Sequence, residues 1–291
     1  MRVKNLAVPF FGVLLFFVSL GAHASLLYQI SGKGIEQPSY LLGTMHVLCE
    51  RDFKIDERVL GALDNTNQLV LELDLADMVV AQQLQSSVRQ PGGPYLKKHL
   101  TDTQFNEVDQ ALQQITGVSL SYFEELRPFV ISNMVVTHYL NCRQLASYEG
   151  FLLQQAKRTG KDVIGLESVA DQIGIFDQIP LSEQSTWLWQ MIAESEQSNE
   201  ELQQMKELFL KEDVEQLYQL IVTQQEFTNY SSILLDERNR NWVEILPPLM
   251  AEQPSFIAVG AGHLGGPQGV IALLRAAGYT VQPVTDSGAA D

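Results

Sequence analysis

The sequence predicts an α/β protein in which a single central β-sheet is built from N- and C-terminal strands and is interrupted by a large, mainly helical insertion. Two observations support this class. Short apolar segments typical of strands occur near both ends of the chain and in two isolated places between them, while segments with helical periodicity fill the rest. No linker rich in Pro, Gly or Ser divides the chain, so residues 25–291 are expected to form one domain.

The first 24 residues are typical of a secretory signal peptide. Two basic residues, Arg2 and Lys4, precede an uncharged apolar run over residues 6–20, and residues 22–24 have the small-x-small pattern of a cleavage site. We therefore expect an exported chain that starts at Ser25 and is periplasmic or secreted. The apolar run is short for an uncleaved anchor, and no later segment approaches the length of a span, so no membrane span is expected after cleavage.

Six segments are expected to be strands, because they are short, apolar and bounded by turn residues. The first two flank a turn rich in Gly and Pro, and the last follows a helix that ends at a glycine. The expected strands are 26–30, 40–42, 68–73, 162–166, 255–259 and 279–284.

Ten helices are expected from capping residues and from apolar residues at helical spacing. The clearest is 101–115, which starts on a Thr-Asp-Thr cap, and Pro128 is a candidate break in the helix over 122–141. The three tryptophans are expected to pack between helices. The expected helices are 57–65, 77–88, 101–115, 122–141, 150–159, 169–176, 182–194, 199–222, 231–250 and 267–277.

The charge balance argues against nucleic acid as a general partner. Asp and Glu number 35 against 19 Lys and Arg, which gives a formal net charge of −16. Such a surface repels phosphate backbones and anionic lipid surfaces. We therefore expect no nucleic-acid partner.

The chain has only two cysteines, Cys49 and Cys142, and they are too far apart in sequence for a CxxC redox motif. In an oxidising compartment a disulfide between them is the favoured interpretation. The alternative is two unpaired, buried thiols.

Two of the four histidines after residue 24 share one local pattern. Each follows an apolar strand and stands three residues after a glycine, in Gly43-x-x-His46 and Gly260-x-x-His263. A glycine lets the backbone turn sharply off a strand end, which would hold each histidine just outside the sheet. His99 and His138 lie in unrelated helical contexts and are expected to be structural or surface residues.

The other two internal strands carry a glutamate at or beside their carboxyl end: Glu72 lies near the end of 68–73, and Glu167 directly follows 162–166. If the four strands are parallel neighbours, Glu72 and Glu167 converge with His46 and His263 on one edge of the sheet, where open α/β sheets bind ligands. Two imidazoles and two carboxylates are suitable ligands for a divalent metal such as Zn, Mn or Co. Asp74 and Asp77 are both N-cap candidates for the next helix, so Asp74 is expected to be a cap rather than a ligand.

Each of these residues also has a purely structural interpretation. The histidines can hydrogen-bond loop carbonyls, and the glutamates can cap helices. Arg238 and Asn239 belong to a polar run that fits a solvated helix face, or can reach the same edge and stabilise an oxyanion.

Taken together, these motifs resemble the TraB/GumN family. The resemblance covers essentially the whole chain after the signal peptide, about Leu26 to Val284, and its most specific parts are the two GxxH motifs and Gly165-Leu166-Glu167. Further positions that match the family pattern are Gln172, Arg238-Asn239, Leu264 and the segment 269–279. Ser168 departs from the threonine that is common after the GLE sequence.

The resemblance implies a metal-dependent hydrolytic site. The family is similar to the Tiki proteins, membrane-associated metalloproteases that cleave the amino-terminal region of Wnt ligands, and more distantly to erythromycin esterases and ChaN-like haem-binding proteins. Carried onto this chain, the resemblance implies His46, His263, Glu72 and Glu167 as the site residues. Arg238 and Asn239 match a polar pair of the family pattern.

The sequence therefore predicts an exported metal-dependent hydrolase, with a peptidase favoured, that acts on a peptide or on a small ester or amide. The metal would polarise the scissile carbonyl and lower the pKa of its bound water. The two histidines and one glutamate would be ligands, the other glutamate would be the general base, and Arg238 and Asn239 complete the catalytic set. The alternative is a non-catalytic protein that binds haem or metal, or a regulator that sequesters a peptide.

Overall fold

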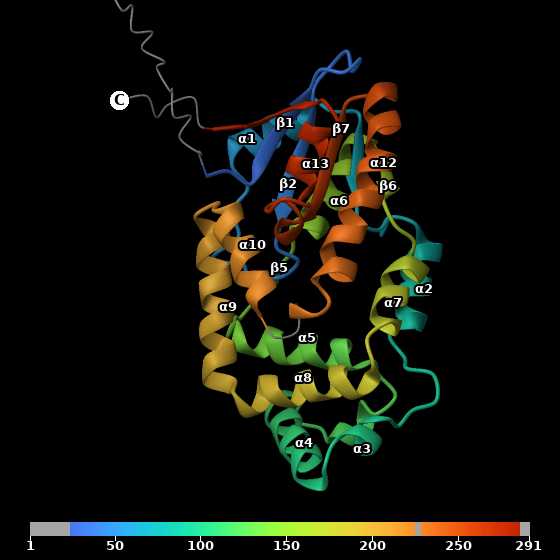
Figure 1. Ribbon diagram of the computed structural model, residues 1–291, viewed down its shortest axis with the longest axis vertical. Helices are drawn as coiled ribbons and strands as arrows, with labels where there is room; N and C mark the ends of the chain where they lie inside the picture. The colour runs from blue at the N-terminus through green and yellow to red at the C-terminus, as the bar shows by residue number, and fades with distance from the viewer. Residues whose placement is uncertain (1–23, 225–227, 286–291) are drawn as a thin grey trace, which may run out of the picture.

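The protein, a computed structural model that describes residues 24–224 and 228–285, is built around a mixed six-stranded sheet (Figure 1). The predicted α/β class is confirmed, with N- and C-terminal strands in the sheet and a helical region between. Residues 1–23 of the predicted signal peptide lie outside the described residues. The strand order is β6 (Asp162–Gly165), β4 (Gln68–Leu71), β7 (Ser255–Gly260), β2 (Ser39–Thr44), β1 (Leu27–Ser31) and β8 (Thr280–Pro283).

Four neighbouring strands of this sheet, β6, β4, β7 and β2, run parallel. They come from widely separated parts of the sequence. The strands β4, β7 and β2 are largely buried, whereas β6, at the edge of the sheet, is exposed or half-buried. The hairpin between β2 and β1 and the pairing of β1 with β8 are antiparallel and extend the sheet on one side. The carboxyl ends of the four parallel strands therefore share one edge.

Helices make up most of the rest of the described chain. The region before β6 contains α1 (Glu57–Asp64), α2 (Met78–Ser87), α3 (Leu96–His99), α4 (Asp102–Thr116), the 3₁₀ turn η1 (Leu120–Tyr122), α5 (Pro128–Tyr139) and α6 (Tyr148–Thr159). After β6 follow α7 (Val169–Asp177), α8 (Leu181–Ala193), α9 (Ser195–Leu210), α10 (Val214–Thr223), the π-helical turn η2 (Ser232–Asp236) and α12 (Glu237–Glu252). The 3₁₀ turn η3 (Ala261–His263) and α13 (Val270–Ala276) lie between β7 and β8.

The sheet and the helical insertion each have a hydrophobic core. The larger cluster surrounds the sheet and includes Leu69, Ile257 and the fully buried Trp242. A second cluster, including Val108 and Ile131, joins the helices α3, α4, α5 and α8 at the end of the molecule away from the sheet (Figure 1). The insertion therefore buries its own apolar faces rather than relying only on the sheet.

The predicted helix over 199–222 is wrong, because the structure has two helices there, α9 and α10. The chain turns at Glu212, whose φ is +57°, and Asp213 caps α10 by accepting a hydrogen bond from the backbone N–H of Gln216. The Glu212 carboxylate accepts hydrogen bonds from the Arg58 guanidinium and from the backbone N–H of Leu26. This tertiary contact stabilises the turn and has no signature in the local sequence.

Other element boundaries also differ from prediction. The helix expected over 122–141 begins only at Pro128, which occupies the first helical position, where its missing N–H has no cost. The helix expected over 267–277 is limited to α13. A two-stranded ladder, β3 (Leu48–Cys49) with β5 (Leu145–Ala146), was not predicted because each strand has only two residues.

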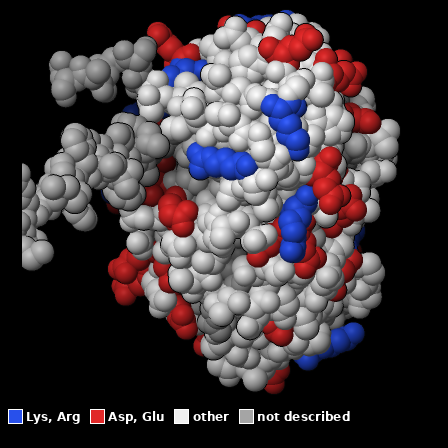
Figure 2. All heavy atoms as spheres, turned by 45° about the horizontal axis from the view of Figure 1, so that its top comes forward, with Lys and Arg blue, Asp and Glu red and all other residues white. Residues whose placement is uncertain are grey.

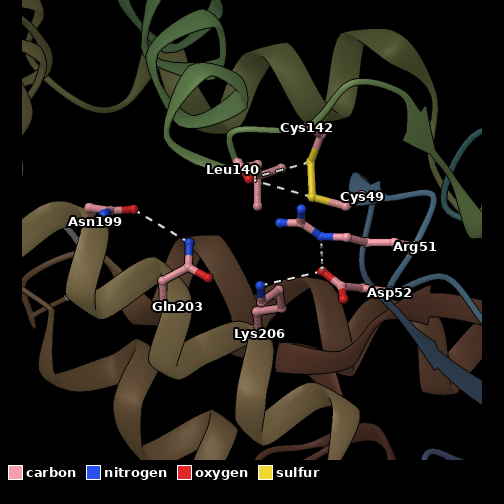
Figure 3. The surroundings of a disulfide bond; sticks show 8 residues. All are labelled: Cys49, Arg51, Asp52, Leu140, Cys142, Asn199, Gln203 and Lys206. Atoms are coloured by element: carbon pink, nitrogen blue, oxygen red, sulfur yellow. Dashed lines mark hydrogen bonds and ion pairs between the residues drawn. A yellow bond between two sulfur atoms is a disulfide. The ribbon is translucent and has the colours of Figure 1, made fainter.

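The predicted disulfide joins Cys49 and Cys142, whose Cα atoms are 5.3 Å apart. It lies beside the β3–β5 ladder and next to the Leu140 carbonyl (Figure 3). Close by, Lys206 of α9 contacts Asp52, so the loop after β3 is attached to the helical region as well.

Acidic side chains are spread widely over the face drawn in Figure 2, and the few basic side chains there do not form a continuous patch. Among the described residues, no helix combines the length and apolar character that a membrane span requires.

Candidate active site at the carboxyl edge of the parallel strands

The four predicted site residues follow the four parallel strands. His46 comes after β2, Glu72 directly after β4, Glu167 after β6, and His263 at the end of η3 after β7. Because neighbouring parallel strands end at the same edge, residues up to 217 positions apart in sequence are brought together there.

The glycines of these motifs allow close approach between backbone segments. A Cβ atom at Gly43 would lie 3.0 Å from Leu264 Cδ2, and one at Gly165 would lie 2.8 Å from the Asp74 backbone nitrogen. None of Gly43, Gly165 and Gly260 has a positive φ. A left-handed backbone conformation is therefore not what requires glycine at these positions. At Gly43 and Gly165 the close approach of neighbouring segments leaves little or no room for a Cβ atom.

His263 is buried and its ring is held at both nitrogens. Asn239 Nδ2 donates to the Gln268 carbonyl, so Asn239 Oδ1 is the acceptor for His263 Nδ1–H, 2.7 Å away. Arg238 Nη1 lies 3.0 Å from His263 Nε2 and can only donate. Burial, followed by the Arg238 charge, lowers the pKa of His263 to about 3. The ring is therefore neutral, with the lone pair of Nε2 directed toward the site.

One turn of α12 supplies three of the groups around His263. Arg238 and Asn239 contact its two nitrogens, and the Trp242 ring packs against the imidazole with centroids 4.4 Å apart. Trp242 also lies under the Arg238 guanidinium, 4.9 Å from ring to cation. The expectation that Trp242 packs between helices is too narrow, since it also supports two site residues.

His46 is held differently, because its side chain is 66% exposed and one hydrogen bond orients it. Its Nδ1 lies 3.0 Å from Glu149 Oε1 on α6. The hydrogen bond to Glu149 raises the pKa of His46 to about 9. Burial would raise the pKa of Glu149, but the bonds from His46 and Thr44 lower it to about 2. Glu149 is thus ionised, and its Oε1 accepts a hydrogen bond from His46 Nδ1–H.

Glu72 is an ionised carboxylate within the site. Its Oε1 accepts from the Gly260 backbone N–H at 2.9 Å, and its Oε2 accepts from Arg238 Nη2 at 2.7 Å. Burial would raise the pKa of Glu72, but the positive charge of Arg238 and its other neighbours lower it to about 2. The carboxylate is therefore charged at neutral pH.

Arg238 lies between the two glutamates. It donates from Nε and Nη2 to the two oxygens of Glu167, at 2.8 Å each, while Nη2 also reaches Glu72. Gln172 of α7 donates to both carboxylates from one amide nitrogen, at 3.1 Å to Glu167 and 3.3 Å to Glu72. The two carboxylates are thus held close together by one cation and one amide.

The space above Gly260 is bordered by three of the predicted ligands. A Cβ atom built there would lie 3.4 Å from Glu72 Oε1, 3.7 Å from His46 Nε2 and 3.6 Å from His263 Cδ2. Glu167 is not part of this set. Within residues 24–224 and 228–285, however, no three His, Cys, Asp or Glu side chains are grouped closely enough to form a metal centre.

The hydrogen bonds at the starts of α2 and α7 show which acidic residues cap these helices. Ser168 caps α7, in a capping box with Asp171, so Glu167 does not cap that helix. Asp77 caps α2, so the expectation that Asp74 caps this helix is wrong. Asp74 instead accepts backbone hydrogen bonds in the turn before the helix. His99 and His138 are exposed and lie outside the site.

Glu149 is a site residue that was not predicted from the sequence. The predicted helix began at Gly150, whereas α6 begins at Tyr148 and is capped by Ser147. An acidic residue in the first turn of a helix is common, because it interacts favourably with the helix dipole. The only local signal was its position beside a cap, which does not distinguish it from other first-turn acids.

A groove opens beside Glu167 and Arg238. It has a volume of about 440 Å³ and runs between α7 and the segment formed by η2 and α12. Apolar side chains, including Ile175, Ile233 and Ile245, line it together with the two site residues. The site is thus accessible from a partly apolar surface.

Comparison with known proteins finds one matching family and two similar metalloproteases. Residues 26–283 match the model of the TraB/PrgY/gumN family. The chain is similar to Metalloprotease TIKI2 of Danio rerio, with 24% identity over 89% of this chain and 60% of that protein. It is similar to Metalloprotease TIKI1 of Xenopus tropicalis, with 25% identity over 84% of this chain and 59% of that protein.

The chain therefore spans about three fifths of the length of these curated relatives. No solved structure matches it significantly. The family match covers nearly all of the described chain and includes both GxxH motifs, so the resemblance inferred from the motifs is confirmed. The chain belongs to the TraB/PrgY/gumN family.

Proposed function

We propose that this protein is a metal-dependent hydrolase that cleaves amide bonds in peptides. The observation that carries the proposal is the arrangement of the two GxxH histidines: each has its Nδ1 bound to a side-chain oxygen, and both rings border the space at Gly260 together with Glu72. An outer acceptor on the second ring nitrogen is typical of histidines that bind metals. The similarity to two proteins named metalloproteases supports the same conclusion.

The donor set fits a divalent metal in its chemistry. His46, His263 and Glu72 offer two imidazoles and one carboxylate, a combination found in catalytic sites for Zn. Arg238 donates to His263 Nε2, so this hydrogen bond has to be released for the imidazole to become a ligand. A bound Zn, Mn or Co ion would supply Lewis-acid polarisation of a carbonyl and a water of lowered pKa.

The two glutamates are assigned different roles by their surroundings. Glu72 borders the space at Gly260 and is ionised, which suits a ligand. Glu167 is bound by Arg238 and lines the groove, where it can accept a proton from a water that attacks a bound peptide. Arg238, held by both carboxylates, is positioned to stabilise the negative charge that develops on the carbonyl oxygen, and Asn239 orients His263.

We further propose that the mature protein, residues 25–291, is exported to the periplasm or secreted. The signal-like first 24 residues and the Cys49–Cys142 disulfide support this location, since disulfides persist mainly in oxidising compartments.

Two isosteric variants test the function and the division of roles. We expect the wild-type protein, purified without chelator or histidine tag, to contain close to one equivalent of Zn, Mn or Co by elemental analysis. Glu72→Gln should lose both metal and peptide cleavage. Glu167→Gln should keep the metal and lose about 10²–10⁴-fold in turnover, the usual contribution of a general base.

An exposed control, Glu200→Gln on α9, should match the wild type in both measurements. Cleavage that persists in metal-free wild-type protein would contradict the proposal. Metal binding without cleavage of any peptide in a mass-spectrometric screen would favour the non-catalytic metal-binding alternative.

A further inference from the structure

Glu149 links His46 to the start of α6. Its Oε1 accepts from His46 Nδ1 at 3.0 Å and from the Thr44 hydroxyl at 2.6 Å, and its Oε2 accepts from the Ser147 hydroxyl at 2.8 Å. Thr44 and His46 belong to the Gly43-x-x-His46 motif, so one carboxylate binds two of the motif's three side chains. The Glu149 side chain is 17% exposed, and these bonds fix its orientation.

His46 depends on this contact more than His263 depends on Asn239. The His263 ring is buried and packs against Trp242, whereas the side chain of His46 is largely exposed. An exposed imidazole without an anchor samples several rotamers, and ordering it on metal binding would cost conformational entropy. The Glu149 hydrogen bond reduces that cost in advance.

The β3–β5 ladder and the disulfide together connect the segment that carries His46 to the segment that carries Glu149. Leu48 pairs with Ala146 and Cys49 with Leu145 in the β3–β5 ladder, and the disulfide closes the same two segments. His46 lies two residues before Leu48, and Glu149 lies three residues after Ala146. The two-residue ladder has little stability of its own, so the disulfide is the main link between these two segments.

We propose that Glu149 is the positioning residue of His46 and that the Cys49–Cys142 disulfide, acting through the β3–β5 ladder, maintains this pair. The inference rests on the proposed function in one respect, the role of His46 as a metal ligand. It extends that function by making metal affinity depend on a residue and a cross-link outside the ligand set.

The test uses Zn²⁺ alone as the probe, titrated into the full purified protein against a chromogenic chelator. Glu149→Ala should weaken Zn²⁺ binding by about 10–100-fold, the usual effect of losing an outer partner of a histidine ligand. Glu149→Gln keeps an acceptor oxygen for Nδ1–H and should restore most of the affinity. Gln154→Ala, an exposed change on the same helix, is the matched control.

The double variant Cys49→Ala/Cys142→Ala should also weaken binding, and adding Glu149→Ala to it should have a much smaller effect than in the wild type. This non-additivity is expected if the disulfide acts through the Glu149 contact. Full additivity, or undiminished affinity in the folded cysteine variant, would overturn the role of the disulfide.

A second measurement does not depend on metal. NMR should show a hydrogen-bonded His46 Nδ1–H proton in the metal-free wild type, assigned by its absence in His46→Gln, and this signal should vanish in Glu149→Ala. If the wild type binds no Zn²⁺ but shows this proton, the proposed function fails and the positioning role stands. If Zn²⁺ binds equally well to wild type and Glu149→Ala, the positioning role is wrong.

Discussion

Asn239 shows how one neutral side chain sets the chemistry of a neighbour. It is almost fully buried, donates to the Gln268 carbonyl and accepts from His263 Nδ1–H. Because its amide is oriented by the carbonyl, it binds His263 in one tautomer only. The histidine thereby presents an unprotonated Nε2 to the site without help from a carboxylate.

We expect Asn239→Ala to lower the free energy of unfolding by about 1–3 kcal/mol, because it leaves two buried polar groups without partners. Asn241→Ala lies two residues along the same helix on an exposed position and should change stability by less than about 0.5 kcal/mol. Urea denaturation of both variants measures the difference. Equal stabilities would show that the Asn239 network does not stabilise the fold.

At the scale of elements, α10 packs directly onto the glycine-rich segment that carries His263. A Cβ atom at Gly262 would lie 2.8 Å from Ile221, and one at Gly266 would lie 2.3 Å from the Tyr218 ring. The side chains of α10 therefore occupy the space that side chains on this segment would need. This contact fixes η3 against the end of β7.

Gly266→Ala should destabilise the protein for two reasons, since Gly266 has a φ of +76° and no room for a Cβ. Gly117 has nearly the same φ, but a Cβ added there would have no neighbour within 4 Å, so Gly117→Ala isolates the backbone cost of about 1–2 kcal/mol. We expect Gly266→Ala to cost about 1–3 kcal/mol more. Thermal and urea unfolding of the two variants measures the loss in the free energy of unfolding, and equal losses would contradict the expectation.

The elements also show what the sequence could and could not predict. The six sheet strands and the convergence of four strand ends were predictable, because apolar runs that end in glycine, histidine or glutamate are local features. The break between α9 and α10 was not, since it depends on Glu212 meeting Arg58 from a distant segment. Glu149 was missed for the same reason: its partner His46 is 103 residues away.

At the scale of the whole molecule, several carboxylates outside the site stabilise the fold only when they are charged. The backbone N–H of Leu120 lowers the pKa of Asp109, and the Ser168 hydroxyl lowers that of Asp171. Burial would raise the pKa of Asp56, but the hydrogen bonds from Arg58 and from the Val59 backbone lower it below its usual value. These residues cap or join elements in different parts of the structure, so acid should weaken many contacts together.

The sign of the pH dependence follows from these lowered values. The unfolded chain binds protons at higher pH than the folded chain does, so this stability is present above the unfolded pKa of about 4 and is lost as pH falls through the folded values. We expect the melting temperature to fall between about pH 5 and pH 3. Asp109→Ala should have a shallower pH slope than the exposed control Gln110→Ala, and an equal slope would contradict the assignment.

The order of the strands has a consequence for synthesis of the chain. The ribosome produces β2, β4 and β6 long before β7, yet β7 lies in the middle of the parallel set, between β4 and β2. A nascent chain that ends before residue 255 has no strand to fill that gap, and one that ends before residue 263 lacks His263. An unfinished or truncated polypeptide therefore carries no assembled site, so the four site residues can come together only once translation is essentially complete.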